Sequence, residues 1–299
     1  MTFALLFTLA ALDVETFLAE ARRGGADGSV GYRDPGPWER AVQGAWFTAV
    51  FAAASRPEAV VPLLPLARLG GLRAGIAEDR GRPVVLVTDL PGRRQGAGAY
   101  VVRLGPVGTE AFVQVPHSWS DLGTLPIGRA LFRAVDARVL GVNTVHRRGR
   151  AGEEATVRGD ADVAHRVEST FQTATVAWLR AGRGGALVQV HGFADERVPF
   201  DAVVSAGPPA DGTGRPPWWL ERFGSALAAA LPGARIAVFP PDGERLAGLA
   251  NVQAQAAVTQ GARFLHLELG ASLRQQLREE TACAALARVL VEVLHAQSP

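Results

Sequence analysis

The sequence predicts an α/β protein: a three-layer fold in which a mixed, largely parallel central sheet is flanked by helices. Short runs rich in valine, isoleucine and leucine, each bounded by glycine, proline or charged residues, are typical of strands. From residue 125 onward, such runs alternate with longer segments whose apolar residues recur at helical spacing. This alternation is typical of layered α/β folds.

Each element follows from its local pattern. Residues 13–68 are expected to be helical: segment 13–22 begins with Asp13, a favourable N-cap, and segment 35–56 starts with proline and has apolar residues at helical spacing. Later helices are expected at 125–135, 162–181 and 218–232, and after residue 270. The expected strands are 71–79, 83–89, 99–105, 111–117, 137–143, 186–192, 202–207, 235–240 and 262–270.

This pattern divides the chain into an N-terminal helical segment, residues 1–68, and an α/β catalytic domain, residues 69–299. The start, residues 1–12, contains FALLFTLAAL, which is too short to span a bilayer. It resembles the apolar part of a signal peptide but lacks the preceding basic residues, and it could equally be a first core helix. We expect a soluble protein without a transmembrane segment. Cytoplasmic and exported locations both stay open, as does the oligomeric state.

Composition excludes several classes of protein. The chain has 299 residues, 48% of them hydrophobic, and a net charge of +2. All 31 basic residues are arginines, and they are scattered along the sequence rather than gathered into one stripe, which argues against nucleic-acid binding. Cys283 is the only cysteine, so an intrachain disulfide and a four-cysteine zinc site are both excluded.

The residues with catalytic potential lie where expected strands end. His117 ends one strand, His191 ends another, and Glu268 lies near the end of the last one. Ligands of open α/β sheets collect beyond the carboxyl ends of the strands. Two histidines and one carboxylate, with a position left for water, form a common catalytic zinc site. We therefore expect Zn²⁺ to be bound by His117, Asp121 and His191, with Glu268 as the general base.

Local geometry favours this ligand set. Asp121 lies in a short loop before Thr124, which is placed to cap the helix that contains Pro126. Such a loop can fold the carboxylate back toward the imidazole of His117. Period-two alternation puts His266 and Glu268 on one face of their strand, where a carboxylate is costly to bury without a partner.

Each residue also has a structural interpretation. A lone histidine at a strand end is more often a hydrogen-bonded turn residue than a ligand, and His-x3-Asp occurs by chance. Glu268 could form a structural ion pair with Arg263 or Arg274. His266 is expected to be a core histidine. The combination of three strand ends favours a metal site over coincidence.

The segments HSWSDLGT, VHG and HLELGASLR resemble motifs of zinc-dependent hydrolases of the carboxypeptidase-like superfamily. The phage-type poly-gamma-glutamate hydrolases are the nearest group, and the N-formylglutamate amidohydrolases are more distant. The resemblance covers roughly residues 110–280. The matching positions are His117, Asp121, Gly123 and Thr124, then His191 and Gly192, then Glu268 and Arg274, with His165 and Ser169 on an expected helix and Asn251 in LANVQAQ.

The resemblance implies hydrolysis of an amide bond next to a carboxylate, such as that of a γ-glutamyl or cell-wall peptide. It implies catalytic roles for Glu268, Arg274 and His165. Arginine suits the recognition of a carboxylate, so Arg147 is expected to bind substrate, together with Asn143 and Asn251. His146 could support the site. Arg147 also lies in the segment HRRGR, which is equally typical of a solvated basic loop.

Two departures leave the substrate open. The first carboxylate is Asp rather than Glu and follows His117 one residue earlier than in the phage enzymes. SWS also replaces a glycine-rich stretch. A non-catalytic peptide- or cell-wall-binding module on a degenerate hydrolase scaffold is therefore the alternative function. A serine hydrolase using Ser205 is weaker, because the G-x-S-x-G pattern is absent.

Overall fold

The computed structural model describes residues 13–23, 25, 31–93, 95–149, 161–182, 185–209 and 214–296. The chain forms two compact units. One comprises Met1–Val107, His117–Ser120 and Arg138–Arg183, and the other comprises Gly108–Pro116, Asp121–Ala137 and Gly184–Pro299. The predicted signal-like start, residues 1–12, lies outside the described residues. The predicted division at residues 68 and 69 stays a prediction.

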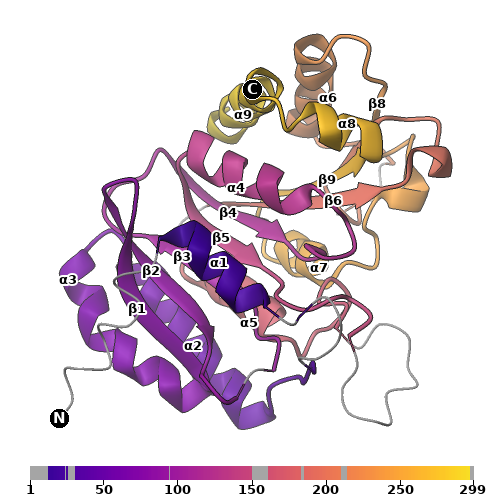
Figure 1. Ribbon diagram of the computed structural model, residues 1–299. Helices are drawn as coiled ribbons and strands as arrows, with labels where there is room; N and C mark the ends of the chain where they lie inside the picture. The colour runs from indigo at the N-terminus through magenta and orange to yellow at the C-terminus, as the bar shows by residue number, and fades with distance from the viewer. Residues whose placement is uncertain are drawn as a thin grey trace. The chain divides into compact units, whose positions relative to one another are not determined.

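The first unit is built on antiparallel strands in the order β1-β2-β3-β5. Helix α1 lies in front of these strands and α2 lies behind them in Figure 1. Helix α2 packs against α5, and aromatic side chains from both helices and from β3 fill the interior. The elements are α1 (Val14–Arg22), α2 (Pro37–Ala53), α3 (Pro57–Val60), the 3₁₀ helix η1 (Val61–Gly70), β1 (Leu72–Asp79), β2 (Arg82–Asp89), β3 (Ala99–Arg103), β5 (Ala137–Val142) and α5 (Thr170–Arg180).

The second unit has strands in the order β4-β6-β9-β7-β8. Pairs β4–β6, β6–β9 and β7–β8 are parallel, whereas β7–β9 is antiparallel. Helices α4 and α9 lie on one side of these strands and α7 on the other (Figure 1). The elements are β4 (Thr109–Val115), α4 (Thr124–Ala134), β6 (Ala186–Phe193), η2 (Asp195–Arg197), β7 (Ala202–Ser205), α6 (Trp218–Ala230), β8 (Ile236–Val238), η3 (Glu244–Leu246), α7 (Val252–Thr259), β9 (Phe264–Gly270), α8 (Ala271–Gln276) and α9 (Glu280–His295).

The predicted α/β class with a mixed sheet flanked by helices is confirmed. The parallel pairs that the sequence led us to expect lie in the second unit. Asp13 caps α1 as expected, because its carboxylate accepts the Thr16 N–H at 2.9 Å. None of the helices in the described parts of the chain combines the length and the apolar character needed to cross a membrane.

Two helix predictions need correction. The helix expected at 162–181 begins only at Thr170, because Ser169 is its N-cap: the Ser169 hydroxyl accepts the Gln172 N–H at 3.0 Å. His165 therefore lies in the turn before α5 rather than on a helix. Thr124, expected as the cap of α4, is instead its first residue, and the preceding Gly123 has φ 91°, a conformation that favours glycine.

Candidate metal centre

A polar face is built by β6 and β9 in the interior of the second unit. The parallel register places Gln189 beside His266 and His191 beside Glu268. Side chains alternate along a strand, so these four share one face while valines and leucines occupy the other. His191, His266 and Glu268 each offer a ligand atom, and those atoms lie within 4.8 Å of one another. The prediction that His266 and Glu268 lie on one face of their strand is thus confirmed.

Asp121 reaches the same region from the loop before α4. Its backbone oxygen accepts the Thr124 hydroxyl at 2.7 Å and the Thr124 N–H at 3.1 Å, which fixes the loop. Its carboxylate accepts the Gly192 N–H at 3.1 Å. The same oxygen, Oδ2, lies 3.6 Å from His191 Nδ1. Both side chains are buried.

The separation of 3.6 Å is informative because it is too long for a hydrogen bond. Two ligand atoms that bind one tetrahedral zinc at about 2.0–2.2 Å are themselves about 3.4 Å apart. Asp121 and His191 therefore have a spacing that two ligands of one metal ion can adopt, and that also suits an ion pair when His191 is protonated. The donor set of imidazole nitrogen and carboxylate oxygen is also one that zinc accepts.

The other ring nitrogen of His191 is already engaged. Its Nε2 lies 2.7 Å from Gln189 Oε1, and Gln189 in turn contacts Asn251 and two further glutamines. Metal-binding histidines usually have such a partner on the nitrogen that does not face the metal. Gln189 is completely buried.

Arg274, predicted to be catalytic, holds backbone carbonyls together. Its guanidinium donates to Leu122 O at 2.8 Å, to Phe193 O at 3.0 Å and to Leu269 O. These carbonyls belong to the loop of Asp121 and to the ends of β6 and β9. Burial lowers the pKa of Arg274, and nearby carboxylates, Asp121 and Glu268 among them, oppose that shift.

The alternative interpretation of Glu268 is a structural ion pair with Arg274 or Arg263. Arg263 donates to the carbonyls at the C-terminal end of α9, at 2.9 Å to Val293 O and 2.7 Å to Ala296 O. Both guanidiniums thus donate to backbone carbonyl oxygens.

His117 lies in the first unit, beside a carboxylate that the sequence did not single out. Its Nε2 is 2.8 Å from Asp162 Oδ1, and His165 Nδ1 is 3.1 Å from the same oxygen. Arg147 pairs with the other Asp162 oxygen, Oδ2, and its Nη1 lies 3.5 Å from His117 Nδ1. His117 is buried, whereas His165 is half exposed.

Electrostatics favour the ionised form of Asp162. Burial acts to raise the pKa of this carboxyl, but hydrogen bonds with His117 and His165 and the charge of Arg147 outweigh burial and hold it well below its usual range. A carboxylate that accepts from a histidine fixes the tautomer and the orientation of the ring.

The two predicted substrate-binding asparagines are both buried. Asn143 accepts the Val145 N–H and donates to Ala161 O, each at 3.3 Å. Asn251 caps α7. His146, considered as a supporting residue, accepts the Arg148 N–H at 3.1 Å in its own loop.

Sequence reasoning missed Asp162 and Gln189. Gln189 could have been found, because it precedes His191 by two residues on an expected strand and therefore shares its face. Asp162 carried no comparable signal. It lies 45 residues from His117 in sequence, and only folding brings the two side chains together.

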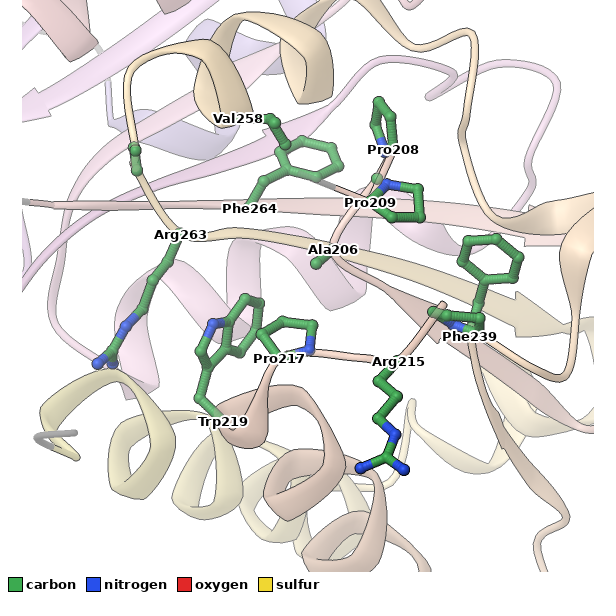
Figure 2. Close-up of a pocket in the computed structure, with 14 residues that line it drawn as sticks. Ala206, Pro208, Pro209, Arg215, Pro217, Trp219, Phe239, Val258, Arg263 and Phe264 are labelled. Atoms are coloured by element: carbon green, nitrogen blue, oxygen red, sulfur yellow. The ribbon is translucent and has the colours of Figure 1, made fainter. Parts of the chain in front are cut away.

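A separate apolar pocket of about 250 Å³ lies in the second unit (Figure 2). It is formed where β7 and β8 end and where β9 begins, and Trp219, Phe239 and Phe264 line it with several prolines. Its lining includes none of the predicted catalytic, substrate-binding or metal-binding residues. The chemistry expected from the sequence is therefore not located in this pocket.

No protein-family model and no curated protein matches the sequence. Among solved structures, N-formylglutamate amidohydrolase from Ralstonia eutropha is similar at 15% identity and a TM-score of 0.40, over 63% of this chain and 95% of that one. A metallo-carboxypeptidase from Pseudomonas aeruginosa is similar at 15% identity and a TM-score of 0.41, over 78% and 69%.

The succinylglutamate desuccinylase from Chromobacterium violaceum is similar at 13% identity and a TM-score of 0.39, over 72% of this chain and 69% of that one. These identities and TM-scores do not assign the chain to a family.

Proposed function

We propose that this protein is a zinc-dependent hydrolase that cleaves an amide bond in a carboxylate-bearing substrate. The observation that carries the proposal is the pair of buried side chains Asp121 and His191, whose facing oxygen and nitrogen lie 3.6 Å apart. That spacing suits two ligands of one zinc ion.

The third proposed ligand is His117. Only three residues separate it from Asp121 in the chain, and those residues form turns, as shown by the hydrogen bond from Ser120 N–H to His117 O at 3.1 Å. Asp162 engages Nε2 of His117, and we assign Nδ1, which lies 3.5 Å from Arg147 Nη1, as the ring nitrogen that would bind a metal. The proposed ligands are thus all buried, and in both histidines Nε2 has a hydrogen-bond partner within the protein.

When bound, zinc would polarise the substrate carbonyl and lower the pKa of water. Glu268 lies directly beside His191 in the β6–β9 register and is only partly buried. We assign it the role of general base, which takes a proton from water and delivers it to the leaving amine. Arg147 is proposed to bind the substrate and His165 to take part in catalysis, because both are partly exposed beside Asp162.

The roles of three residues change in this proposal. The guanidinium of Arg274 is bound to backbone carbonyls, so it positions the loop and strand ends rather than reacting with substrate. Asn143 and Asn251 are buried and hydrogen-bonded internally, so they support the site rather than contact substrate.

The test is to measure the zinc content of the purified parent protein and of its His191→Ala and Glu268→Gln variants. Hydrolysis of γ-glutamyl and cell-wall peptides is then assayed with the same proteins. We expect about one zinc per chain in the parent and in Glu268→Gln, and none in His191→Ala. Hydrolysis should fall by about 10²–10⁴-fold in Glu268→Gln if this residue is the base rather than a ligand.

Absence of zinc from the parent after reconstitution would refute the metal site. Zinc binding without turnover of any peptide would instead favour the binding-module alternative. Loss of zinc from Glu268→Gln would make Glu268 a ligand, as its place beside His191 and His266 also allows.

A further inference from the structure

A chain of buried hydrogen bonds connects the backbone of α7 to His191. It starts at Asn251, whose Oδ1 accepts the N–H groups of Gln253 at 2.9 Å and Ala254 at 3.0 Å. Backbone N–H groups can only donate, so the oxygen end of this amide must face the helix. The cap of α7 therefore fixes which way the Asn251 side chain is turned.

The amide nitrogen of Asn251 consequently faces Gln189. Asn251 Nδ2 donates to Gln189 Oε1 at 2.5 Å. At the other end of the Gln189 amide, Nε2 donates to Gln114 Oε1 at 2.9 Å and to Gln253 Oε1 at 3.2 Å. The hydrogen bonds at its two ends thus require the same orientation of the Gln189 amide, with Oε1 toward Asn251 and Nε2 toward the two other glutamines. All four side chains are buried, so water does not replace these partners.

The orientation of Gln189 decides the protonation of the imidazole. Gln189 Oε1 has only lone pairs, and it lies 2.7 Å from His191 Nε2. Nε2 must therefore carry the proton. In a neutral imidazole the other nitrogen, Nδ1, then keeps its lone pair, and this is the nitrogen that lies 3.6 Å from Asp121.

We infer that Asn251 and Gln189 are positioning residues that set the tautomer of His191, so that Nδ1 is the nitrogen available to a metal ion. The tautomer itself follows from the hydrogen bonds alone. Its use for metal binding rests on the proposed function.

The test is ¹⁵N NMR of histidine-labelled, metal-free protein at a pH near 8, with the His191 signals assigned by comparison with His191→Gln. The parent is expected to carry the His191 proton on Nε2. Asn251→Asp keeps the oxygen that caps α7 but replaces the donating NH₂ with a second oxygen. Gln189 should then turn its amide, with Gln114 and Gln253 turning theirs to keep a donor opposite each acceptor. The turned Gln189 presents NH₂ to His191 and shifts the proton to Nδ1.

Zinc affinity of Asn251→Asp should fall by about 10–100-fold, the usual effect of losing a partner of a metal-binding histidine. Gln255→Glu is the matched control, because it makes the same amide-to-acid change on an exposed position of α7. Gln189→Met removes the acceptor without adding charge and should leave His191 as a mixture of tautomers. This variant keeps the inference testable if Asn251→Asp does not fold.

Two results would overturn the inference: a proton on Nδ1 in the parent, or an unchanged tautomer in both Asn251→Asp and Gln189→Met. A parent with the proton on Nε2 that binds no zinc would refute the proposed function and uphold the tautomer assignment. The two failures are thus distinguishable.

Discussion

At the scale of single residues, Arg274 shows how one side chain can organise several segments. Its planar guanidinium has donors that point in different directions, and the structure uses them on carbonyls from three places in the chain. Gly192 makes this close approach feasible, because a Cβ at that position would lie 2.3 Å from Arg274 Nη1. The residue therefore acts by holding together the carbonyls of the Asp121 loop and of the ends of β6 and β9.

Arg274→Lys keeps the charge, but all its N–H donors are on one nitrogen, so they do not reproduce the contacts that Nε and Nη1 of the guanidinium make with carbonyls in different places. Leaving a buried carbonyl without its donor costs about 1–3 kcal/mol, so we expect a loss of stability of at least this order. The measurement is the free energy of unfolding from urea titration, beside Arg278→Lys on the same stretch of chain. An unchanged unfolding free energy would show that the guanidinium is free for another role, such as catalysis.

At the scale of elements, parallel pairing of β6 and β9 explains why the polar side chains meet. Parallel strands in register bring residues from distant parts of the sequence side by side at the same sheet edge. His191 and Glu268 are 77 positions apart in sequence, yet they are direct neighbours across the pair. The opposite faces of both strands are apolar and buried.

Helix α9 offers a pH-dependent prediction through Cys283. Burial raises the pKa of this thiol, so the folded protein keeps the proton to higher pH than the unfolded chain does. The thiol's contribution to stability is therefore fully present below about pH 8.5 and declines as the pH rises above that value.

The measurement is the difference in unfolding free energy between the parent and Cys283→Ala at pH 7 and at pH 9.5. We expect this difference to shrink at the higher pH. Since Cys283 is the only cysteine, its slow reaction with a thiol reagent in the folded protein gives an independent check. Rapid labelling of the folded protein would contradict the burial of this residue.

At the scale of the whole molecule, a bound metal should stabilise the folded chain by mass action. Free zinc at 100 times its dissociation constant would add about 2.7 kcal/mol to the free energy of unfolding, provided that the unfolded chain does not bind it. We expect zinc to raise the midpoint temperature of thermal unfolding of the parent, and a chelator to reverse this shift.

His191→Ala should show no such shift, while His295→Ala, at the exposed end of α9, should behave like the parent. Equal zinc shifts in the parent and in His191→Ala would mean that the metal binds elsewhere.

The sequence by itself determined the periodic features of this protein. Strand alternation placed His266 and Glu268 on one face, and Asp13 marked the start of α1, because both depend on residues only a few positions apart. The α/β class followed from the same local patterns. The start of α5 was predicted too early, since the apolar pattern continues before the Ser169 cap.

Only the tertiary structure decided the partners of the candidate ligands. Segments far apart in sequence are joined in three places. These are the pairing of His117 with Asp162, the contacts of Arg274 with three carbonyls, and the chain of buried hydrogen bonds from α7 to His191. Hydrogen bonds between such segments depend on strand order, register and side-chain direction together. Local sequence patterns do not encode these, because each is fixed only when the sheet and its covering helices pack.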